Sequence, residues 1–228
     1  MGFLKALESL SWGNILPYVL NLLVALPCIT LHEMAHGWAA YKLGDSTAKD
    51  LGRLSLNPLR HLDPLGLILM ITVGFGWAKP VPIDMRRFRE PKKGMALSSL
   101  AGPLSNILLS IMALAIAGLI YRSGSVLNYG AGKWAFIVLV YIAIRSTFLG
   151  LFNLIPIPPL DGSRLLTAVL PDDIYYRLMR FERYLILIVF ALCFFGPLAD
   201  IVYKAGGWVL DKLCVITFFP RGLMSELI

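Results

Sequence analysis

The chain alternates between long apolar runs and short polar connections, and four of the runs are long enough to be full membrane spans. We expect these spans at residues 13–43, 94–121, 134–155 and 182–204. About 20 apolar residues in helical conformation cross the ~30 Å of hydrocarbon in a bilayer. The pattern therefore predicts an all-α polytopic membrane protein with about four transmembrane helices.

A shorter apolar run at residues 65–77 departs from this pattern. It is too short to cross a bilayer comfortably, so we expect a re-entrant or interfacial element that enters and leaves on one side. Pro80 and Pro82 follow it, and each proline disfavours helix at the residue before it. Residues 79–84 are therefore predicted to be a small extended, β-like segment.

Composition agrees with a membrane protein. Hydrophobic residues make up 57% of the chain and charged residues 15%, whereas soluble domains contain about a quarter charged residues. The net charge of +7 arises from Lys and Arg in the connections between apolar runs, which is typical of membrane loops and does not indicate nucleic-acid binding. No polar linker divides the chain, so residues 1–228 are expected to form one membrane-embedded domain, with a core at 13–170 and a C-terminal span and tail at 182–228.

The basic residues also indicate an orientation. If residues 65–77 do not cross, residues 42–93 and 164–183 lie on one side with fourteen Lys and Arg residues, against six on the other side. Lys and Arg accumulate in cytoplasmic loops. We therefore expect the C-terminal end of the first span to lie nearer the cytoplasm.

His32, Glu33 and His36 form a His-Glu-x-x-His motif inside the first apolar run. On a helix the two His residues share one face and can bind one Zn²⁺, while Glu33 can take a proton from a water on the metal. The alternative is a pair of core histidines beside a buried Glu. An unpaired carboxylate in lipid costs several kcal/mol, which a bound cation offsets. The apolar setting indicates water chemistry below the surface of a bilayer.

Asp161 is the best candidate for a third ligand, because it follows the Pro-rich end of the third span. With a re-entrant run at 65–77 it emerges on the same side as His36. Its alternative role is the N-cap of a following helix. Asn153 is a candidate hydrogen-bond donor to a substrate carbonyl or developing oxyanion, or else a helix cap or interhelical bond. Asn106 has the same two interpretations, and for it the structural one is favoured.

These motifs together resemble the site-2 protease family of intramembrane zinc metalloproteases. They are His32-Glu33-x-x-His36, Gly102-x-x-x-Asn106 and Asn153-x-x-Pro156-x-Pro158-Pro159-Leu160-Asp161-Gly162. Residues 52–58 and 76–82 resemble the compact prokaryotic branch, and we find no inserted peptide-binding domain. The resemblance, which covers residues 25–170, implies one Zn²⁺ per chain on His32, His36 and Asp161, with Glu33 as catalytic base. It also implies a multi-pass protein of a prokaryotic inner membrane.

From these observations we expect an intramembrane zinc metalloprotease that hydrolyses a peptide bond within or near a transmembrane helix of a partner membrane protein. Residues 81–83 are expected to pair with an unwound substrate by strand addition. Two alternatives are a catalytically silent metal-binding membrane protein and a metal-dependent transporter, for which intramembrane His and Asp are usual. Glu33 argues against both, because neither needs a base beside the ligands.

Overall fold

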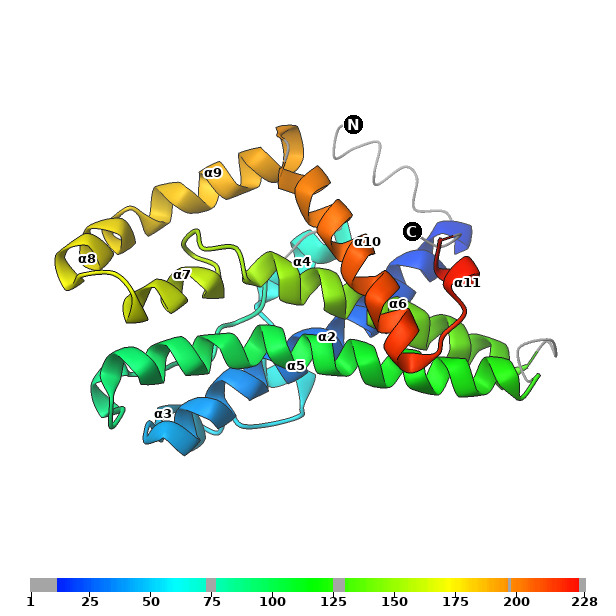
Figure 1. Cartoon of the computed structure of the whole chain (residues 1–228), viewed down its shortest axis with the longest axis horizontal. Helices are drawn as coiled ribbons and strands as arrows, with labels where there is room; N and C mark the ends of the chain where they lie inside the picture. The colour runs from blue at the N-terminus through cyan, green and yellow to red at the C-terminus, as the bar shows by residue number, and fades with distance from the viewer. Residues whose placement is uncertain (1–11, 73–76, 125–129, 197, 226–228) are drawn as a thin grey trace.

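The computed structural model describes residues 12–72, 77–124, 130–196 and 198–225. These residues form a helical assembly in which no multi-residue strand is described (Figure 1). The long helices are α2 (Trp12–Leu43), α5 (Pro91–Arg122), α6 (Ala131–Asn153) and α10 (Leu198–Thr217). The shorter elements are α3 (Thr47–Asp50), η1 (Pro58–Arg60), α4 (Pro64–Thr72), η2 (Met85–Arg87), α7 (Asp161–Leu165), η3 (Leu166–Ala168), α8 (Asp172–Arg180), α9 (Glu182–Phe195) and α11 (Arg221–Ser225).

Helix α5 lies at the centre and makes its most extensive contacts with α6 and α2. Pro91 begins it, and the fixed φ of proline suits the first position of a helix. Many of its buried positions carry small side chains, which let neighbouring helices approach closely. They include Gly94, Ala96, Ser98, Ser99, Gly102, Ser110, Ala113, Ala117 and Gly118. The hydroxyls of Ser110 and Thr147 lie 2.8 Å apart and join α5 to α6 in the buried interface.

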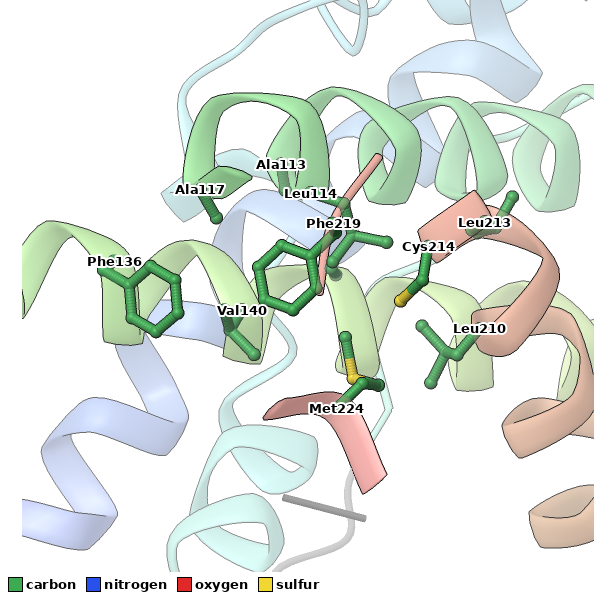
Figure 2. Close-up of a cluster of buried hydrophobic side chains, with 11 residues drawn as sticks. Ala113, Leu114, Ala117, Phe136, Val140, Leu210, Leu213, Cys214, Phe219 and Met224 are labelled. Atoms are coloured by element: carbon green, nitrogen blue, oxygen red, sulfur yellow. The ribbon is translucent and has the colours of Figure 1, made fainter. Parts of the chain in front are cut away.

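The C-terminal helices pack on α5 and α6 through a hydrophobic cluster (Figure 2). Leu114 of α5 and Leu210 of α10 are fully buried in it. The ring of Phe219 stacks on Phe136 of α6 with centroids 5.9 Å apart. The remaining members are Ala113, Ala117, Val140, Ala143, Leu213, Cys214 and Met224. Residues 198–225 are thereby anchored on the two central helices.

The span predicted at residues 182–204 is divided between two helices. Helix α9 ends at Phe195, Gly196 adopts an extended conformation that cannot continue a helix, and α10 begins at Leu198. The chain turns sharply between them (Figure 1). Among the described residues, α5 and α6 are long and apolar enough to cross a membrane by length and composition. The total of four spans remains a prediction.

Helix α4 belongs to a short excursion whose two ends meet. Leu62 before it and Ala78 after it form an isolated antiparallel bridge. A Cβ atom on Gly66 would lie 2.1 Å from the carbonyl oxygen of Trp77, so this close approach requires glycine. The chain thus returns to the place it left, as a re-entrant element requires.

Residues 79–84 follow this excursion and belong to no described strand, so the bridge at Ala78 is the only described β pairing near the predicted β-like segment. Asp45, which is fully buried at the end of α2, holds the segment in place. Its Oδ2 accepts a hydrogen bond from the backbone N–H of Asp84 at 2.7 Å, and its Oδ1 accepts one from the N–H of Thr47 at 2.9 Å. The segment is therefore docked beside the C-terminal end of α2.

Candidate metal centre

Three potential ligand atoms converge between α2, α5 and the start of α7. The Nε2 atoms of His32 and His36 lie 3.0 Å apart, and Oδ2 of Asp161 lies 3.0 Å and 3.1 Å from them. The two His residues occupy successive turns of α2, and Asp161 is the first residue of α7. Within the part of the chain that the structure describes, they form the one group of three His, Cys, Asp or Glu side chains able to share an ion.

The size of this triangle fits a single small divalent cation. Zinc bonds nitrogen and oxygen at about 2.0–2.2 Å, so neighbouring ligands of a tetrahedral ion lie roughly 3.3 Å apart. The three observed separations are 3.0–3.1 Å. Two imidazoles and one carboxylate are also a donor set of catalytic zinc sites, which keep a fourth position for water. The residues present therefore fit a catalytic zinc ion.

The outer nitrogen of each imidazole is held by α5. His36 Nδ1 lies 2.7 Å from the backbone carbonyl oxygen of Ser98. A carbonyl only accepts, so His36 carries its proton on Nδ1 and presents the lone pair of Nε2 to the site. His32 Nδ1 lies 3.0 Å from the side-chain amide of Asn106. The contacts to α5 thus orient both rings, as hydrogen bonds to the outer nitrogen of a ligand histidine do at metal sites.

Gly102 lets α5 pass close over the two rings. A Cβ atom at this position would lie 2.3 Å from His36 Nε2 and 2.8 Å from His32 Cε1. Asn106 follows one turn later and therefore lies on the same face of the helix. The Gly102-x-x-x-Asn106 motif thus has a physical role, since the glycine makes room for both imidazoles and the asparagine contacts one of them.

Glu33 is partly exposed beside the ligands and contacts the segment after the excursion. Its Oε2 accepts a hydrogen bond at 2.8 Å from the backbone N–H of Val81. Pro80 and Pro82 flank Val81 and have no N–H, so this is the one backbone donor in the tripeptide. The bond leaves the other carboxylate oxygen of Glu33 to act as a base.

Asn153 is placed differently from the other predicted site residues. It is the last residue of α6, and its side-chain amide donates to the carbonyl oxygen of Leu149 in the same helix at 2.9 Å. None of the hydrogen bonds described for the chain joins Asn153 to the three ligand side chains. Its role toward a substrate oxyanion stays a prediction.

Three residues support the site in ways that the sequence did not predict. Ser98 acts through its backbone carbonyl, for which the sequence has no signal. The Ser146 hydroxyl donates to the backbone carbonyl of Asn106 at 2.9 Å, and a polar residue inside an apolar run was a signal for it. Val81 acts through its backbone N–H, and its position between two prolines was the available signal.

Comparison with known proteins places the chain in a family. Residues 119–196 match the sequence profile of peptidase family M50. The chain is 40% identical to YwhC of Bacillus subtilis, named as a candidate zinc metalloprotease, over 214 residues that cover 91% of this chain and 95% of that protein. No solved structure matches the chain significantly.

More distant relatives carry similar names. Rip2 of Mycobacterium tuberculosis, also named as a candidate zinc metalloprotease, is 27% identical over 212 residues, covering 91% of this chain and 78% of that protein. The zinc metalloprotease MJ0392 of Methanocaldococcus jannaschii is 25% identical over 175 residues, which cover 76% of this chain and 41% of that protein. The chain therefore belongs to peptidase family M50, the site-2 protease family of zinc metalloproteases.

Proposed function

We propose that this zinc metalloprotease cleaves a peptide bond within or near a transmembrane helix of a partner membrane protein. The observation that carries the proposal is the burial of the ligand set against a helix that is able to cross a membrane. His32 and His36 are each 5% exposed, and both contact α5, which is long and apolar enough for a span. Chemistry at this position takes place between helices and not at an open protein surface.

The side chains have distinct roles in this reaction. His32, His36 and Asp161 would hold the zinc ion, which supplies a Lewis acid that polarises the attacking water and the scissile carbonyl. Glu33 accepts the proton of that water and delivers it to the leaving amine nitrogen. The N–H of Val81 holds one oxygen of Glu33 and so orients the other for proton transfer.

The substrate must be locally unwound, because the amides of an intact helix are shielded by their own hydrogen bonds. Residues 79–84 are docked beside the site, and residues 81–83 among them would pair with an extended substrate by strand addition. The N–H of Val81 is already used by Glu33, and Pro80 and Pro82 have none. Residues 80–82 therefore offer a substrate their carbonyl oxygens and no backbone donor.

We also propose that the site lies toward the cytoplasmic face of a prokaryotic inner membrane. The backbone N–H of Arg89 donates to the carbonyl oxygen of Leu43 at 3.3 Å, which joins the start of α5 to the end of α2. The exposed cations Arg86, Arg87, Arg89, Lys92 and Lys93 lie at this end of the two helices. Such clusters are typical of the cytoplasmic side of membrane proteins.

Cleavage by purified protein in phospholipid vesicles tests the proposal. The probe is a single-span model protein with a Gly-Pro pair at the centre of its transmembrane helix, which weakens the helix locally. We expect the parent chain to cleave it and the Glu33→Gln variant to be slower by about 10²–10⁴-fold. Cleavage by Glu33→Gln at the parent rate would remove Glu33 from the chemistry, and no cleavage by the parent chain would contradict the proposed substrate class.

A further inference from the structure

Asn106 connects all three long helices at the site. Its side chain on α5 reaches Nδ1 of His32 on α2 at 3.0 Å. The hydroxyl of Ser146 on α6 donates to the Asn106 backbone carbonyl at 2.9 Å and lies 3.3 Å from Asn106 Oδ1. Asn106 and Ser146 are both fully buried. A continuous polar chain therefore runs from α6 through α5 to the ring of His32.

His32 can be a ligand only in one of its two neutral tautomers. Its Nε2 points at His36 and Asp161, so binding a cation there requires the lone pair on Nε2 and the proton on Nδ1. The Nδ1–H group then needs an acceptor. The amide of Asn106 is the partner at that nitrogen. Its oxygen can accept a hydrogen bond from Nδ1–H, whereas its nitrogen can only donate.

Only one orientation of the amide satisfies every group in the metal-binding state. The structure places Nδ2 toward His32 and Oδ1 toward Ser146, and in this orientation the amide donates to Nδ1 and the His32 proton must lie on Nε2. A half-turn of the amide exchanges the two atoms with little change in shape. Oδ1 then accepts from His32 Nδ1–H, Nδ2 donates to the Ser146 hydroxyl, and that hydroxyl still donates to the Asn106 carbonyl.

His36 differs from His32 in this respect. Its Nδ1 faces the backbone carbonyl oxygen of Ser98, which can only accept and therefore keeps Nε2 ready for a cation. Of the two ligand imidazoles, only His32 depends on a side chain that can present either a donor or an acceptor.

We propose that Asn106 is a positioning residue for the metal, and that the orientation of its amide decides whether His32 is in the tautomer that binds zinc. With the oxygen toward His32 the site holds the ion, and with the nitrogen toward His32 the site favours release. The proposal rests on the proposed function only for the identity of the metal, and it is tested without any substrate.

The test is a comparison of zinc binding by four purified proteins in detergent micelles. Dissociation constants are measured by competition with a chromogenic chelator, and the ligand geometry is followed by the visible absorption of Co²⁺-loaded protein. The variants are Asn106→Leu, which has no polar group, and Asn106→Asp, which has only acceptors. Ser110→Ala is the matched control, because it removes a buried hydrogen bond between α5 and α6 one turn away.

We expect Asn106→Leu to weaken zinc binding by about 10–100-fold, as loss of an outer-shell partner does, and to change the Co²⁺ spectrum. Asn106→Asp should stay within a few-fold of the parent affinity and keep its spectrum, and Ser110→Ala should match the parent.

Parent affinity in Asn106→Leu would overturn the proposal. So would a loss in Asn106→Asp as large as in Asn106→Leu, because the amide would then act as a donor or by packing alone. Failure of the parent chain to cleave membrane substrates would leave these zinc measurements unchanged and so would count only against the proposed function.

Discussion

Single positions on α5 determine the geometry of ligands that belong to another helix. His32, Glu33 and His36 could be assigned from their spacing alone, because four residues bring two side chains to one face of a helix. The hydrogen-bond partners that hold the rings and the carboxylate of these residues could not be assigned in the same way. Which face of α5 meets α2 depends on packing across the whole assembly, so the contact of Asn106 with His32 had no local signal. The Ser98 carbonyl could not be found either, since every residue has one.

Gly102 gives a prediction at this scale. In Gly102→Ala the new methyl group would overlap the ring atoms of His36, because the Cβ position lies 2.3 Å from Nε2. We expect the rings to be displaced and the zinc dissociation constant, measured by competition with a chromogenic chelator, to rise by about 10–100-fold, as it does when a ligand histidine loses its support.

The matched control is Gly118→Ala on the same helix. Its nearest neighbours lie 3.9 Å from the Cβ position, so the methyl group fits, and alanine is the better helix former by about 0.5–1 kcal/mol. Parent zinc affinity in both variants would show that α5 does not approach the rings as closely as described.

At the scale of elements, hydropathy located the first three long helices well and the last one poorly. The predicted spans at 13–43, 94–121 and 134–155 lie within three residues of the bounds of α2, α5 and α6. Residues 184–199 carry no charged side chain, so hydropathy did not reveal that Gly196 ends one helix and that α10 continues to Thr217. The buried face of α10 became visible only in its packing on α5 and α6 (Figure 2).

The excursion between Leu62 and Ala78 gives a prediction for this element. Because its two ends are paired, residues on either side of it must lie on one face of the membrane. In a cysteine-free background, single cysteines at the exposed positions Lys49 and Arg86 are expected to react with a membrane-impermeant maleimide from the cytoplasmic side. A cysteine at the exposed position Ala131, at the start of α6, should react only from the other side.

Reaction of the Lys49→Cys and Arg86→Cys proteins from opposite faces would place the excursion across the membrane. His36 and Asp161 would then be separated by the bilayer, which is incompatible with the 3.1 Å between their ligand atoms.

At the scale of the whole molecule, the fold brings together residues 125 positions apart in the chain, His36 and Asp161. Helix α2 supplies two ligands and the base, α5 orients the rings, and α6 delivers the Pro-rich end that leads to Asp161. The resemblance of the motifs implied this ligand set, while the distances between atoms could come only from the assembled helices. Family membership and the donor geometry support the same zinc chemistry by independent routes.

The zinc content of the purified parent, Asp161→Ala and Glu33→Gln proteins, determined together with cleavage of the single-span probe, tests the site most directly. We expect one zinc per chain in the parent and in Glu33→Gln, and almost none in Asp161→Ala, because the loss of one of three protein ligands leaves only two imidazoles. Cleavage should fall by about 10²-fold or more in both variants, with zinc retained only in Glu33→Gln. Full zinc content and parent activity in Asp161→Ala would contradict the assignment of the site.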